Sequence, residues 1–174
     1  MKRLGIAVLI FTALSSFGQK NLKGTKGVGV DVGMTDLGYY LGPTFNYSFS
    51  SRFYLKSSFL YERGQIELTN SDVNINSLYL GGGSYYNLFD IKDFSFFDVG
   101  VGLQGTMANI NDTNEGVGSF SGQEFDLSLF VGGEIRFFVS EKVILLLNHK
   151  QTYQPLGNFG KWIPFTGAGA VYNF

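Results

Sequence analysis

The chain has 174 residues, and its 13 basic and 14 acidic side chains leave a formal net charge of −1, which excludes the basic footprint of a nucleic-acid-binding protein. Its 24 glycines argue against a helical bundle, because glycine costs about 1 kcal/mol at a helix position, and an aromatic content of 17% argues against a disordered chain. The absence of cysteine excludes a disulfide scaffold, a thiolate metal site and a cysteine nucleophile.

The N-terminus has the three parts of a secretory signal peptide. Residues 1–3 carry positive charge, residues 4–14 are apolar, and small residues precede a cleavage point before Gln19. The apolar run is too short for a membrane-spanning helix, which needs about 20 residues. We therefore predict a signal peptide at 1–18, a periplasmic leader at 19–26 and a transmembrane β-barrel at 27–174.

The rest of the chain alternates in polarity with a period of two, which is typical of β-strands. In the segment 39–49 the odd positions are Tyr39, Leu41, Pro43, Phe45, Tyr47 and Phe49, while the even positions are mostly small or polar. The same alternation predicts eight strands, at 27–35, 39–49, 53–62, 75–88, 96–107, 125–139, 143–151 and 161–174.

The connections between these strands alternate in length. The second, fourth and sixth are short, at 50–51, 89–93 and 140–142, and the others are 35–38, 63–74, 109–123 and 152–160. Short turns at one end and longer polar loops at the other are typical of outer-membrane barrels. We therefore expect an all-β protein, an eight-stranded antiparallel up-and-down β-barrel in the outer membrane of a Gram-negative bacterium, with both termini periplasmic.

A water-soluble β-sandwich would also have one apolar face, so the C-terminus carries part of the argument. Gly169, Tyr172 and Phe174 match three of the four positions in the assembly signal of outer-membrane barrels, and Gly167 stands at the fourth, polar position. These residues predict recognition by the barrel-assembly machinery. The signal peptide and the aromatic residues near the strand ends favour the barrel as well.

The second face of the strands points into the predicted barrel. Isolated buried charges are very unfavourable, so we expect the charged residues of this face to pair as an interior network of Lys56, Glu62, Asp98, Glu134 and Arg136. Large aromatic side chains share the same face, namely Tyr54, Tyr79, Tyr85, Phe96, Phe130 and Phe138. Because eight strands enclose a space just wide enough for side chains, we expect a filled interior rather than an open pore.

Catalytic and metal-binding patterns are weak. His149 is the single histidine, and Gln151 occupies the position where a serine would complete a Ser–His pair, so we place His149 at the barrel rim and predict no enzyme. The acidic and amide residues at 109–112 lack the spacing of a calcium loop, and the glycines at 81–83 lack the lysine of a phosphate loop. No cofactor or metal site is expected.

Several short motifs, at 24–27, 36–38, 81–82 with 85–86, 143–148 and 157–161, are followed by a glycine-rich aromatic last strand. In these motifs the chain resembles the TraO family of conjugal transfer proteins from Bacteroidetes-type bacteria. The resemblance implies an outer-membrane component of a conjugative DNA-transfer apparatus and implies no catalytic residues. A porin-like barrel that serves adhesion or envelope integrity is the alternative, followed by a lipid-modifying barrel enzyme.

The expected partners are outer-membrane lipid, the barrel-assembly machinery and other proteins of a conjugation system, with no direct contact to nucleic acid. Lys20, Lys23 and Lys26 place three cations before the barrel, where they would attract an acidic partner or remain a solvated leader. Both of the first two functions need the same barrel, so we expect specificity to lie in the loops 63–74 and 109–123.

Overall fold

The computed structural model describes residues 23–68, 71–92, 94–112, 121–155 and 162–174. The predicted signal peptide and residues 19–22 of the predicted leader lie outside this part of the chain.

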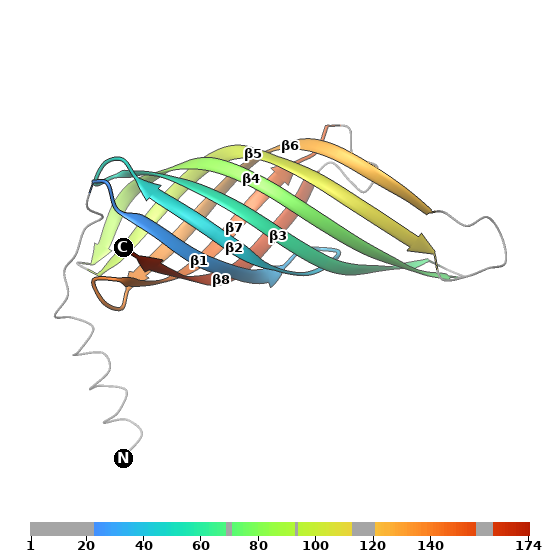
Figure 1. Ribbon diagram of the computed structural model, residues 1–174, viewed down its shortest axis with the longest axis horizontal. Coiled ribbons are helices and arrows are strands. Elements are labelled where there is room, and N and C mark those ends of the chain that lie inside the picture. The colour runs from blue at the N-terminus through green and yellow to red at the C-terminus, as the bar shows by residue number, and fades with distance from the viewer. Residues whose placement is uncertain (1–22, 69–70, 93, 113–120, 156–161) are drawn as a thin grey trace, which may run out of the picture.

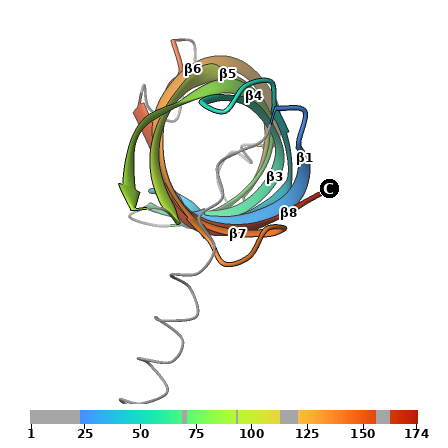
Figure 2. The ribbon, with the colours of Figure 1, turned by 90° about the vertical axis from the view of Figure 1, so that its left-hand side faces the viewer.

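Eight strands of the described residues form one closed sheet (Figure 1). Each strand pairs antiparallel with the next, and β8 pairs with β1, so the ring is continuous when viewed along its axis (Figure 2). Closure gives every strand two neighbours, which satisfies backbone groups without water. The predicted eight-stranded antiparallel barrel is confirmed. The strands are β1 Lys26–Met34, β2 Gly38–Ser48, β3 Phe53–Leu68, β4 Ser71–Lys92, β5 Ser95–Asp112, β6 Ser121–Phe138, β7 Val143–Tyr153 and β8 Trp162–Asn173.

The strands are staggered around the ring. From Met34, the register partners through β2, β3, β4 and β5 lead to Gln123 on β6. The partners through β8 and β7 lead instead to Gly133, which lies ten positions further along β6 than Gln123. This stagger tilts the strands and gives the narrow barrel that eight strands can close.

Both ends of the barrel sequence and the three short turns lie at one end, here called the short-turn end (Figure 1). The amide of Phe174 donates to the carbonyl of Lys26 at 2.8 Å, which ties β8 to β1. Two turns use the same device: Ser50 Oγ accepts from the amides of Arg52 and Phe53, and Ser140 Oγ accepts from those of Lys142 and Val143. A serine hydroxyl that bonds the backbone two and three residues later favours a tight turn.

The opposite end, here called the extended end, corrects the prediction of long loops. The segment 63–74 is mostly sheet, because β3 runs to Leu68 and β4 starts at Ser71. Likewise β5 and β6 include residues 109–112 and 121–123, and β7 includes Thr152 and Tyr153. The alternation of polar and apolar residues is weak here because the strands continue beyond the lipid-facing apolar band. Neither face of the sheet then needs apolar side chains.

The predicted turn at 89–93 is also wrong in its bounds, since β4 continues to Lys92. Two register shifts, between Asn87 and Phe89 and between Asp90 and Lys92, interrupt its pairing with β5. Such bulges add a residue on one strand and break the two-residue period of polarity. The predicted strand therefore ends at residue 88, four residues before the end of β4.

Candidate functional site

The barrel interior holds a layer of charged side chains. Lys56 Nζ lies 2.9 Å from an oxygen of Asp31 and also forms an ion pair with Glu134, and the three side chains are at most 7% exposed. Asn148 Nδ2 donates to Asp31 at 3.4 Å. Buried charges of this kind are stable only when they are paired and hydrogen-bonded, and each member here has such a partner.

A second ion pair joins the first through a tyrosine. Arg136 Nε donates to Asp98, and Asn87 Nδ2 donates to the other oxygen of Asp98 at 3.1 Å. The Tyr54 hydroxyl is 2.9 Å from Glu134 and 3.4 Å from Asp98, while the Arg136 guanidinium lies 4.4 Å from the Tyr54 ring centroid. The interior network therefore joins four of the five charged residues expected from the sequence.

The fifth expected member, Glu62, lies apart from that network. Its carboxylate accepts hydrogen bonds from the hydroxyls of Thr35 and Tyr79. Thr35 Oγ1 also accepts from the amides of Leu37 and Gly38, so Glu62 fixes the β1–β2 turn. Glu62 lies closer to the extended end than Lys56 on the same strand, beyond the apolar residue Leu60.

Two interior charges were missed in the sequence. Asp31 stands on the glycine-bearing face of β1 and could have been assigned inward from the valines that alternate with it. Lys150 also faces inward, where its Nζ donates to Gln104 Oε1 at 2.5 Å and lies 4.2 Å from the Phe165 ring centroid. A cation over an aromatic face gains electrostatic stabilisation from the ring. Lys150 alternates with outward His149 and Gln151 on β7, so its inward position follows from the parity of that strand.

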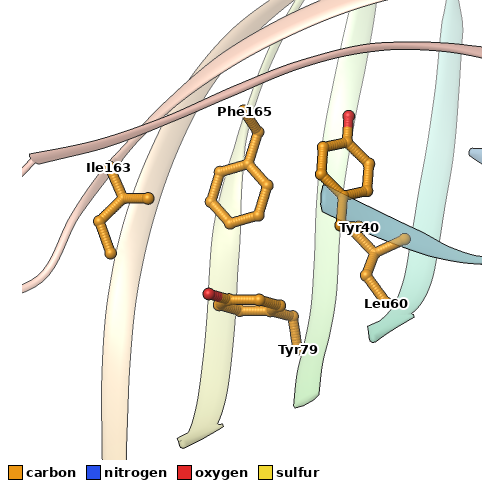
Figure 3. Packing of buried hydrophobic residues seen from close by; sticks show 5 residues of the cluster. All are labelled: Tyr40, Leu60, Tyr79, Ile163 and Phe165. Carbon is orange, nitrogen blue, oxygen red and sulfur yellow. The ribbon is translucent and has the colours of Figure 1, made fainter. Parts of the chain in front are cut away.

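Apolar clusters close the interior on both sides of the charged layer. Toward the extended end, Tyr79 packs edge-on against Phe165 and Tyr40 tilts against it, with ring centroids 5.1 and 5.5 Å apart (Figure 3). Leu60 and Ile163 complete this group, here called the upper plug. Toward the short-turn end, the lower plug consists of Phe96, Phe138, Ile144, Leu146 and Val171.

The remaining inward aromatics lie between the plugs. Tyr54 and Tyr85 stack with centroids 5.1 Å apart, and Phe130 joins them. A cavity beside Asp31, Lys56, Glu134 and Lys150 has a volume of about 30 Å³. That space has room for about two or three water molecules and lies between the plugs, so it is far too small for a solute path. The six aromatics expected inside are buried as predicted, and the described interior is filled.

The outward face is apolar and is bounded by aromatic side chains. At the short-turn end, Phe49, Phe53 and Tyr86 pack in sequence, with centroids 5.6 and 4.7 Å apart. At the other limit, Tyr153 packs on Trp162 at 4.8 Å. Valines, leucines and phenylalanines fill the surface between them, as in Val30 at 44%, Leu103 at 52% and Phe59 at 49% exposed. An apolar band between aromatic girdles is the surface of a barrel that faces lipid.

His149 belongs to this outward face rather than to the rim. Its Nδ1 lies 2.8 Å from Thr166 Oγ1 on the neighbouring strand. Gln151 follows at the next outward position of β7. Among the described residues there is no group of His, Cys, Asp and Glu side chains that could hold a metal ion. The same part of the chain contains no helix long and apolar enough to cross a membrane.

At the extended end, β3 to β6 project beyond the other strands (Figure 1). Pairing of β2 with β3 ends at Gly64, and pairing of β7 with β6 begins only at Leu129. Residues 121–128 of β6 therefore pair with β5 alone within the described chain. Phe125 lies on this free edge and is 73% exposed. The projecting wall is here called the sheet extension.

The three residues of the predicted assembly signal lie on β8 or directly after it. Gly169 faces inward, where an added Cβ would meet Asp31 Oδ1 at 2.2 Å, so the position accommodates the charged layer. Tyr172 and Phe174 face outward and are 48% and 64% exposed. Their role as a signal stays a prediction.

Solved structures of small outer-membrane barrels are similar to this fold. The N-terminal β-barrel domain of Pseudomonas aeruginosa OprF has a TM-score of 0.62 at 16% identity, covering 88% of this chain and 100% of that chain. Ail, the attachment invasion locus protein of Yersinia pestis, has a TM-score of 0.60 at 12% identity, with coverage of 88% and 100%. Neisserial surface protein A has a TM-score of 0.62 at 14% identity, with coverage of 86% and 96%.

No family model matches the sequence, and no curated protein matches it. At these identities, the structural likeness establishes the fold alone. The chain has the fold of eight-stranded outer-membrane barrels.

Proposed function

We propose that this protein is an outer-membrane barrel of a Gram-negative bacterium that acts through its surfaces, as a structural component, rather than by transport or catalysis. The observation that carries the proposal is the sealed interior: two apolar plugs enclose a paired charged layer, and the cavity between them measures about 30 Å³. A transport role needs a continuous water-filled path, which larger barrels provide.

The proposed orientation has both termini and the short turns in the periplasm. The predicted signal peptide, the short turns at one end and the longer hairpins at the other support it. In this orientation the sheet extension stands on the cell surface. Lys23 and Lys26 are exposed and lie on the periplasmic side, where an acidic protein would find them.

The finer proposal is a component of a conjugative DNA-transfer apparatus, supported by the resemblance to the TraO family. Deleting the gene should lower the transfer frequency of donor cells and leave recipient ability intact, because the apparatus is built in the donor. Replacing Lys20, Lys23 and Lys26 by Glu should keep the barrel level and lower transfer if these cations dock a partner. Unchanged transfer after gene deletion removes the conjugation proposal.

The second candidate is surface adhesion, and the sheet extension favours it. Within the described residues, β6 at 125–128 pairs with β5 alone, and this edge with exposed Phe125 offers backbone groups and apolar surface to another molecule. One of the similar structures, Ail, is called an attachment invasion locus protein. In the proposed orientation the sheet extension stands on the cell surface, where it would contact a host cell or a neighbouring cell.

A single excision separates the two candidates. Thr106 and Asp126 are register partners, so a two-residue Asn-Gly turn between them can replace residues 107–125, which removes Phe125 and the β6 edge at 121–125. Adhesion should be lost in this variant, while transfer that depends on the periplasmic side should remain. The proposed sealed interior is tested separately by bilayer recordings, and a large steady conductance of the purified barrel would contradict it.

A further inference from the structure

The outward face of β7 and β8 carries polar side chains inside the lipid-facing band. His149, Gln151 and Thr166 point outward there, and the side chain of Gln151 makes no hydrogen bond to any described residue. Elsewhere in the band the outward residues of the described strands are apolar or glycine, apart from the small hydroxyls of Ser57 and Ser84. Polar groups concentrate on one wall of the barrel.

The side chains of His149, Gln151 and Thr166 are here called the wall patch, and their depth in the membrane follows from the strand register. Tyr153 opposite Trp162 marks one aromatic limit, and Val143 opposite Tyr172 marks the other. At about 3.3 Å per residue and a strand tilt near 40°, His149 lies about 10 Å inside the first limit and about 15 Å from the second. Its ring is therefore surrounded by acyl chains when the barrel stands alone in a membrane.

The hydrogen bonds of the patch are only partly satisfied. The Nδ1 atom of His149 lies 2.8 Å from Thr166 Oγ1, and its second ring nitrogen has no hydrogen-bond partner among the described residues. The Gln151 amide retains both its donor and its acceptor. In lipid no water satisfies them, so a partner that supplies hydrogen bonds is favoured.

Small residues surround the polar ones. Ala168 and Ala170 follow Thr166 at the next outward positions of β8, and Gly133 is the register partner of His149 on β6. Small residues allow two membrane segments to approach closely, and polar residues then join them. The patch combines both properties, whereas the small outward residues of the opposite wall, such as Ser57, Gly82 and Ser84, have no imidazole or amide side chain beside them.

We propose that this wall is the contact surface for a second copy of the chain within the membrane. The inference rests on the proposed membrane residence of the barrel. A twofold axis along the membrane normal keeps both copies in the same orientation and brings residues of equal depth together. His149 and Thr166 are register partners and Gln151 is two residues away, so the three meet their own counterparts.

The chemistry of the patch selects a like partner. An amide both donates and accepts, so Gln151 can pair with Gln151 of the second copy, and the free nitrogen of His149 can pair with the hydroxyl or amide opposite. The outward residues here include no Lys, Arg, Asp or Glu, so the patch has nothing that would attract an oppositely charged membrane protein.

Single-cysteine variants test the contact directly, because the chain contains no cysteine. Gln151→Cys and Thr166→Cys should form disulfide-linked dimers when vesicles of the purified barrel are oxidised. Leu80→Cys, four strands from β8 on the opposite wall, is the matched control. Equal dimer yields at the three positions, or no dimer at any, would overturn the proposal. A cross-link only to a different protein in native membranes would overturn it as well.

A second measurement separates contact from folding. His149→Leu with Gln151→Leu should weaken dimer association in vesicles about tenfold, by energy transfer between labelled copies, while raising the stability of the single barrel in lipid. Ser84→Leu removes a polar group from another wall and should leave association unchanged. Association that is unchanged in the double variant would refute the contact.

All variants are first checked for the folded, membrane-embedded state by their faster migration on unboiled gels and by extraction only with detergent. The parent barrel undergoes the same check, and its failure at this step refutes the membrane residence of the barrel. Embedded, folded barrels that do not associate refute only the pairing of copies.

Discussion

Lys56 is the cation whose loss should harm the barrel most. It contacts Asp31 at 2.9 Å and also Glu134, and both carboxylates are at most 7% exposed. Lys56→Met keeps the length of the side chain and leaves these carboxylates without their cation. Breaking a buried pair by removing one partner loses about 3–5 kcal/mol, and we expect a fall of this size in the free energy of unfolding.

Neutral donors nearby will offset only part of this loss. Asn148 reaches Asp31 at 3.4 Å, and the Tyr54 hydroxyl reaches Glu134 at 2.9 Å. Adding Asp31→Asn and Glu134→Gln to Lys56→Met removes the uncompensated charges together. The triple variant should therefore recover most of the lost stability, because a neutral interior of similar volume is often as stable as a buried ion pair.

The assay uses the single tryptophan. Trp162 is 57% exposed on the outward face, so its emission reports transfer between lipid and water. Urea titration in vesicles gives the free energy of unfolding for each variant. Lys142→Met, the same change at an exposed turn residue, should stay within about 0.5 kcal/mol of the parent. A loss below about 1 kcal/mol for Lys56→Met would refute the electrostatic reasoning.

Three further perturbations test the packing and assembly of the barrel. Gly100→Ala should cost about 1–3 kcal/mol, because its Cβ would lie 2.4 Å from the Tyr85 ring, while Gly82→Ala, with open space around it, should be neutral in the same urea titration. Phe165→Ala should cost about 3–5 kcal/mol yet leave bilayer conductance unchanged, since the lower plug still closes the interior. Deleting Phe174 should lower the level of folded barrel in the outer membrane, whereas Phe174→Tyr should not, and equal levels for deletion and parent would remove the assembly-signal prediction.

The barrel could be predicted from the sequence because every second residue of each strand faces lipid within the apolar band, where apolar side chains are favoured. Where one face is apolar throughout, as at Val28, Val30 and Val32, the parity of every residue follows. The inward position of Tyr54, Phe130 and Glu134 then needed only counting. The same counting placed Lys56 and Arg136 inside, although it could not tell which carboxylate each would reach.

The partners of each charge depend on the stagger between strands, which the sequence pattern does not reveal. Lys56 on β3 reaches Glu134 on β6 across the barrel, and such cross-barrel contacts depend on depth as well as direction. Glu62 lies only six residues after Lys56 on β3 and points inward as well. Its depth along the barrel axis nevertheless places it beyond Leu60, where it contacts Thr35 and Tyr79. The sequence could predict which charged side chains point inward, but it could not predict their depth along the barrel axis.

The sheet extension escaped prediction for the opposite reason. Outside the membrane no face of β3 or β4 must be apolar, so Arg63, Gln65 and Asn76 resemble loop residues although they pair in register. The sheet extension is thus the part of the described barrel with the weakest sequence pattern. Because the interior is closed at two levels, a change in activity without a change in barrel stability should trace to this extension, to the short-turn end or to the wall of β7 and β8.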